Sequence, residues 1–159
     1  MILVEVEIED DAWSGVESGI EAAVARAVEA ALSAEHSGQV TVLLTDDDAV
    51  ADLNSRFRDR SGPTNVLSFP ATRSARPHLG DLALAYGVCA READDQGKTM
   101  LQHVQHLVAH GALHLVGFDH QTDDEAEVME ARERAILAGL GVPDPYAADD
   151  LPFVAPRER

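Results

Sequence analysis

Three closely spaced histidines constrain this chain more than any other feature. Residues 110–120 read HGALHLVGFDH. If the preceding residues form a helix, His110 and His114 lie one turn apart and present both imidazoles on one face. Gly117 can then take a left-handed conformation that ends the helix, and the chain can bring His120 back beside the first pair. Three imidazoles with one open coordination position are typical of a catalytic zinc site.

A single His pair on a helix is usually a half-exposed face, so the third histidine is what makes metal binding the favoured interpretation. The spacing equals that of the metzincin metalloproteases, H-E-x-x-H-x-x-G-x-x-H. Gly111 occupies the position of their general-base glutamate. The sequence therefore predicts a metzincin-like metal cage without the peptidase base.

His106 is a rival ligand, because it pairs with His110 in the same way as His114 does. Choosing His106 leaves His120 unexplained, so we expect His106 to hydrogen-bond a ligand or to pack in the core. The remaining histidines have no comparable context and are expected at the surface: His36, His78 and His103.

Apolar periodicity predicts an α+β fold with the element order βαβαββααα. Strands are expected at residues 2–9, 39–44, 65–69 and 79–86, the third of them at a sheet edge. Helices are expected from Ser14 to about Ala34, from Thr45 to Arg58, after Tyr86 to Gly97, from Thr99 through the histidines, and from Thr122 to Leu140. Capping boxes are expected at Ser14 and Glu17, Thr99 and Gln102, and Thr122 and Glu125.

These elements predict one small mixed four-stranded sheet packed with about five helices, with the zinc site at the end of a helix. We expect a single domain over residues 1–141. Residues 142–159 are rich in proline and acids, and are expected to form a disordered tail, above all beyond Tyr146.

The charge distribution leaves two interpretations open. A net charge of −17 alone argues against nucleic acid as a partner. Residues 56–76, however, hold one acid and five arginines, a local balance of +4: Arg56, Arg58, Arg60, Arg73 and Arg76. This strip is either a phosphate-binding surface or a solvated loop.

Cysteine content and hydropathy indicate the compartment. The single cysteine, Cys89, cannot form an internal disulfide and lies in an apolar stretch, so we expect a buried, inert thiol. No cationic, apolar leader opens the chain, and no apolar run reaches the ~18 residues of a membrane span. We expect a cytoplasmic protein with no membrane contact.

Two long, gapless segments make the chain resemble the YbeY family of bacterial rRNA maturation factors, described as single-strand-specific endoribonucleases. The first runs from Leu53-Asn54 through Phe57-Arg58 to the stretch PTNVLSFP at residues 63–70, and the second is residues 110–120. Shorter matches occur at Gly80-Asp81, Gln96-Gly97 and Asp144-Pro145-Tyr146. The resemblance covers residues 40–146.

The resemblance implies that His110, His114 and His120 bind one zinc ion per chain, and that Arg58 is the active-site arginine. It also implies a function in rRNA maturation, including 16S rRNA 3′-end processing, and in ribosome quality control. The implied partners are single-stranded RNA of the small subunit and the small ribosomal subunit itself. No small-molecule cofactor is implied.

These residues suggest hydrolysis of an RNA phosphodiester, with zinc as Lewis acid and Arg58 holding the phosphate. No general base is obvious. Asp119 either accepts a proton or, as we favour, orients a ligand imidazole. Asn65 and Ser68 either contact substrate or form hydrogen bonds at the end of a strand.

Two other functions remain open. The first is a small-subunit assembly factor with a mainly structural zinc, which the missing base favours. A structural site normally closes with four protein ligands, however, and the sequence offers three good ones. The second, a metal hydrolase of small molecules, leaves the arginines without a role.

Overall fold

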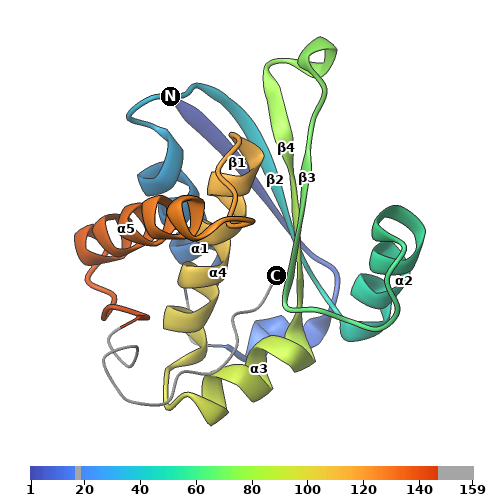
Figure 1. Cartoon of the computed structure of the whole chain (residues 1–159). Helices are drawn as coiled ribbons and strands as arrows, with labels where there is room; N and C mark the ends of the chain where they lie inside the picture. Colours follow the sequence, from blue (N-terminus) through green and yellow to red (C-terminus); the bar gives the residue numbers. More distant parts are fainter. Residues whose placement is uncertain (17–18, 147–159) are drawn as a thin grey trace.

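Four strands form one mixed sheet, in the order β1 (Ile2–Ile8), β2 (Gly38–Thr45), β4 (His78–Ala85) and β3 (Val66–Pro70). The computed structural model describes residues 1–16 and 19–146 (Figure 1). The strand pairs β1–β2 and β2–β4 are parallel, whereas β3 is antiparallel to β4. The expected mixed four-stranded sheet is confirmed, and β3 lies at its edge.

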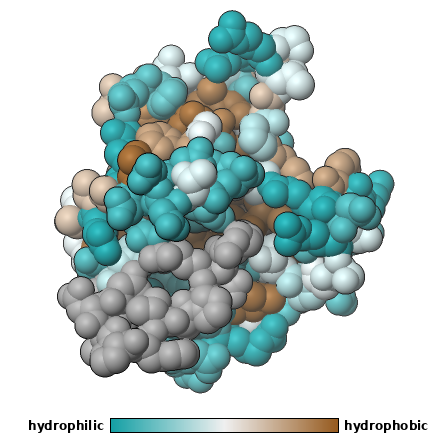
Figure 2. Space-filling view, in the orientation of Figure 1, coloured by the Kyte–Doolittle hydropathy of each residue, from teal (hydrophilic) through white to brown (hydrophobic). Residues whose placement is uncertain are grey.

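The helices cover the two faces of the sheet unequally. Figure 1 shows α1 (Ile20–Leu32), α4 (Met100–Leu115) and α5 (Asp123–Gly139) on one side, with α2 (Asp47–Arg58) on the other. The helix α3 (Tyr86–Asp95) connects β4 to α4, and two short 3-10 helices complete the described part: η1 (Asp11–Gly15) and η2 (Arg73–Ala75). The surfaces that α5 and α2 turn to solvent are mostly hydrophilic (Figure 2).

The two faces of strand β3 pack into different hydrophobic cores. The larger core lies between the sheet, α1 and α4 and includes Val66, whereas Leu67 joins a smaller core under α2. Successive side chains of a strand point to opposite faces, so Ser68 faces α4 again. The edge strand therefore separates α2 from the helix that carries the histidines.

The N-terminal helix begins later than the sequence pattern predicted. Ser14 lies inside η1 instead of capping a helix, and α1 starts at Ile20 after Gly19. Trp13 is fully buried, and its indole N–H donates to the Thr45 carbonyl oxygen at 2.8 Å. Burial of this large side chain fixes the 3-10 turn, which overrides the local capping signal. Glu17, the other half of the expected box, lies outside the described residues.

Helix α2 also differs from the expectation in detail. Asp46 caps it by accepting the Ala49 N–H at 2.7 Å, while Thr45 is buried at the end of β2. The helix ends where Asp59 takes a left-handed conformation with φ 54°. Phe57, one residue before the end of the helix, is 63% exposed.

Two expected capping boxes and the burial of Cys89 are confirmed. The capping boxes of Thr99 with Gln102 and of Thr122 with Glu125 are both complete. Cys89 is buried, and this burial raises the pKa of its thiol. In the part of the chain that the structure describes, no helix is long and apolar enough to cross a membrane.

The first residues of the expected tail are packed on the fold. Val142 contacts a small apolar cluster with Ala109 and Leu137, and the Tyr146 hydroxyl donates to Glu133 at 2.7 Å. The predicted disorder beyond Tyr146 falls on residues 147–159, which lie outside the described residues.

We expect Trp13→Ala to lower the free energy of unfolding by about 3–5 kcal/mol, because it leaves a large cavity and the Thr45 carbonyl loses its donor. Urea unfolding measures this change. Leu3→Ala, at a side chain 57% exposed, serves as a control that changes stability little. A loss below about 1 kcal/mol for Trp13→Ala would show that η1 does not depend on the indole.

Candidate metal centre

Three histidines meet at the C-terminal end of α4. The possible ligand atoms of His110, His114 and His120 all lie within 4.8 Å of one another. The Nε2 atoms of His110 and His114 are 3.1 Å apart, and the ring centroid of His120 lies 5.4 Å and 5.0 Å from the centroids of these two rings. Gly117 has φ 102°, the left-handed conformation that lets the chain turn back.

Hydrogen bonds at the opposite ring nitrogens set the tautomers of the two helical histidines. His110 Nδ1 lies 2.8 Å from Glu133 Oε1, and His114 Nδ1 lies 2.8 Å from the Phe118 carbonyl oxygen. Because these oxygens accept, each Nδ1 carries the proton and each Nε2 keeps its lone pair. Two lone pairs that face each other at this distance fit a shared cation, so the donor set suits a divalent metal ion.

The protonation state of His114 fits the same interpretation. Burial, and then the charges that His110 and His120 can carry, lower the pKa of His114 to about 4. The imidazole is therefore neutral near pH 7, which is the form that binds metals.

Sequence reasoning missed Glu133, which lies fully buried on α5 behind the cage. Its carboxylate accepts from His110 Nδ1 at 2.8 Å, His106 Nε2 at 3.2 Å and the Tyr146 hydroxyl at 2.7 Å. Burial alone would raise the pKa of Glu133, but the hydrogen bonds from His106 and His110 hold it well below its usual range. A sequence signal existed, because Glu133 interrupts an apolar stripe between the buried residues Met129 and Leu137.

The two other histidines of α4 are outside the cage. The described bond of His106 is not to a ligand: its Nε2 lies 3.2 Å from Oε1 of Glu133, the carboxylate that also bonds to His110. The expectation that His103 lies at the surface is wrong: it is 3% exposed, and its Nε2 lies 2.9 Å from Glu92 Oε1. Glu92 on α3 also accepts from the amide of Asn65 at 3.1 Å, which supports the strand-end interpretation of Asn65.

Arg58 bonds to the edge strand β3. Its Nη2 donates to the Ser68 carbonyl oxygen at 2.5 Å, and the Ser68 hydroxyl donates to the Gly111 carbonyl oxygen at 3.2 Å. Gly111 follows His110 directly, so Ser68 connects the arginine to the cage helix. A Cβ at Gly111 would lie 2.9 Å from a Leu82 methyl carbon and 3.0 Å from Ser68 Oγ, so any larger residue here would require these side chains to shift.

The structure divides the basic strip of residues 56–76. Arg56, Arg58 and Arg60 lie at the end of α2, whereas Arg73 and Arg76 lie at the tip of the β3–β4 hairpin (Figure 1). Arg58 is therefore the strip residue with a described link to the cage.

Asp119 lies in the turn that presents His120. Its Oδ1 accepts the backbone N–H of His120 at 2.8 Å. The described partners of the His110 and His114 Nδ1 atoms are Glu133 and Phe118 instead. The predicted role of Asp119 in orienting an imidazole or accepting a proton stays a prediction.

Comparison with known proteins identifies relatives over nearly the whole chain. The sequence profile of the family described as "Endoribonuclease YbeY" matches residues 5–141. The Endoribonuclease YbeY of Maricaulis maris is 52% identical over 152 residues, which span 94% of this chain and 95% of that protein. The protein of the same name from Rhodopseudomonas palustris is 51% identical over 155 residues, which span 92% and 82%.

One solved structure has a similar fold. The solution structure of TM1509 from Thermotoga maritima aligns over 100% of both chains with a TM-score of 0.57. At 22% identity, this likeness supports the fold alone.

We expect Glu133→Gln to weaken metal binding by about 10- to 100-fold, because a neutral amide no longer holds the His110 imidazole with a full charge. Competition with a chromophoric chelator measures the affinity. Glu127→Gln, at an exposed position of the same helix, is the matched control. Equal affinities for the two variants would show that Glu133 has only a packing role.

Proposed function

This chain belongs to the endoribonuclease YbeY family, and from that premise we propose that it is a zinc-dependent endoribonuclease that cleaves single-stranded RNA during rRNA maturation. The observation that carries the proposal is the pairing of an open three-histidine cage with Arg58 through Ser68. We further propose that its substrate is small-subunit rRNA, including the 16S 3′ end, that it acts in ribosome quality control on the small subunit, and that it works in the cytoplasm.

The ligand set favours zinc with one open position. His110, His114 and His120 supply three imidazoles, the number typical of catalytic zinc sites that keep a fourth position for water or substrate. Zinc, when bound, supplies a Lewis acid that polarises a phosphoryl oxygen or activates water for attack. Glu133 and the Phe118 carbonyl hold two of the imidazoles in the tautomer that exposes Nε2 to the metal.

Arg58 is placed to bind the phosphate. Arg58 is an exposed residue, and its bond to the Ser68 carbonyl fixes one end of the planar guanidinium. The remaining N–H groups can donate to phosphate oxygens and offset the negative charge that grows in the transition state. Asp119 remains our candidate for orienting His120 or accepting a proton.

An assembly factor with a structural zinc is the alternative. Such a site would need a fourth protein ligand, and the strongest candidate was His106. His106 Nε2 bonds to Glu133, and the described cluster that can hold a metal contains only His110, His114 and His120. This arrangement argues for a catalytic site.

We expect one zinc ion per chain, and we expect His114→Ala to lose it along with part of the stability, because the cage loses its central ligand. Elemental analysis of the purified proteins measures the metal. His36→Ala, which removes a histidine outside the cage, should keep a full equivalent. A His114→Ala protein with one zinc at micromolar concentration would remove His114 from the ligand set.

We expect Arg58→Ala to slow cleavage of single-stranded RNA by about 10²- to 10³-fold while zinc content and melting temperature stay nearly unchanged. Arg58→Lys should restore little, because an ammonium group lacks the bidentate fork. Arg26→Ala, at an exposed position on α1, controls for the change in net charge. Cleavage of one labelled RNA at wild-type rate by Arg58→Ala would assign this arginine a structural or assembly role.

A further inference from the structure

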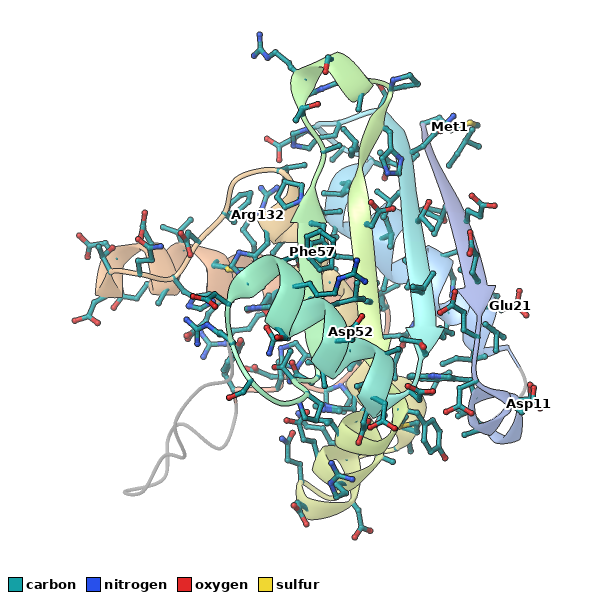
Figure 3. All side chains as sticks on the ribbon, turned by 90° about the vertical axis from the view of Figure 1, so that its right-hand side faces the viewer. Met1, Asp11, Glu21, Asp52, Phe57 and Arg132 are labelled. Carbon is teal, nitrogen blue, oxygen red and sulfur yellow. The ribbon has the colours of Figure 1, made fainter. Side chains whose placement is uncertain are left out.

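Phe57 is an exposed aromatic side chain at the end of α2 (Figure 3). Four large hydrophobic side chains are exposed among the described residues, and Phe57 is the only aromatic one: Met1, Leu3, Phe57 and Val128. At 63% exposed, Phe57 keeps most of its surface in contact with solvent, directly beside Arg58. Most of the phenyl ring is therefore available to a ligand.

Phe57 is part of a group of two aromatic rings and two arginines. Its ring lies edge-to-face against Phe69, with centroids 5.9 Å apart and planes at 74°. The guanidinium carbon of Arg56 is 5.7 Å from the Phe57 centroid, and that of Arg58 is 5.9 Å from the Phe69 centroid. We call these four residues the aromatic-arginine group.

We propose that Phe57 is a stacking platform for one base of a single-stranded RNA, with Arg56 and Arg58 at the adjacent phosphates. Exposed aromatic rings flanked by cations are the usual means of binding unpaired nucleotides, because every base offers a π face and every linkage a negative charge. This inference rests on the proposed function, since it assigns a subsite to the same substrate.

Only the edge strand β3 lies between this platform and the helix that carries the cage. Phe69, which contacts Phe57, and Ser68, which bonds to Gly111, are adjacent residues of the edge strand β3. Their side chains point to opposite faces, so an RNA strand that crosses the free edge of β3 meets the platform on one side and the histidines on the other. Bases in a duplex are already stacked on their neighbours, so the platform selects for unpaired RNA.

Charge favours RNA over a protein or a second copy of this chain as the occupant. The net charge of −17 repels RNA as well as a second copy, but the end of α2 is locally cationic and suits an anionic partner, with three arginines against Asp59: Arg56, Arg58 and Arg60. Arg56 forms an exposed ion pair with Asp52 at 3.3 Å. Because exposed ion pairs are weak, a phosphate can take the place of the Asp52 carboxylate.

The test compares Phe57→Ala, Phe57→Leu and Phe57→Trp with the wild type on a short, labelled single-stranded RNA that contains 2-aminopurine. We expect the Ala and Leu variants to raise KM by about 5- to 100-fold and to change kcat by less than about twofold, because stacking binds substrate without stabilising transition-state charge. Phe57→Trp should keep the wild-type KM. Leu3→Ala, on the opposite edge strand, is the matched control for loss of an exposed apolar side chain.

Fluorescence of 2-aminopurine, which falls when the base stacks, separates this inference from the proposed function. If the wild type cleaves RNA and Phe57→Ala has the same KM, the platform is wrong while the nuclease stands. Retention of the wild-type KM by Phe57→Leu also overturns stacking and indicates a general apolar contact, as with a protein partner. If the wild type cleaves nothing, quenching that Phe57→Ala abolishes still supports the platform, and equal or absent quenching overturns it.

Discussion

The buried carboxylate of Glu133 connects α4, α5 and the residues after α5 at the metal centre. Removing an ionised Glu133 from water is costly, and one missing donor would leave part of that cost uncompensated. His106 and His110 of α4 and Tyr146 beyond α5 supply the donors. The position of α5 against α4 therefore depends on the same hydrogen bonds that orient a metal ligand, so metal binding and folding are coupled in this region.

The edge strand joins two sites that the sheet would otherwise keep apart. Leu67 and Phe69 pack toward α2, while Ser68 between them reaches α4. Alternation along one short strand thus connects the arginine end of α2 to the cage without a loop. Gly111 is closely packed against Leu82 and Ser68 at this point, where the metzincin motif has its glutamate.

Local patterns predicted the cage, the strand order along the chain and two capping boxes, because each depends on residues close in sequence. The errors arose where tertiary contacts decide. Trp13 is buried under Thr45, and this shifts the start of α1 beyond the capping signal. His103 is buried because Glu92 from another helix bonds to it, and Glu133 acquires its role from partners on other segments. None of these partners is visible in the local sequence.

The hydroxyl of Tyr146 has a practical consequence for anyone who trims the protein. A shortened version that stops at residue 141, the boundary suggested by composition, keeps every helix and strand of the described fold. It nevertheless removes Val142 from its apolar cluster and one donor from Glu133. Such a version would have a normal circular dichroism spectrum but a lower affinity for its metal. The spectrum alone would therefore be a poor guide to the quality of the preparation.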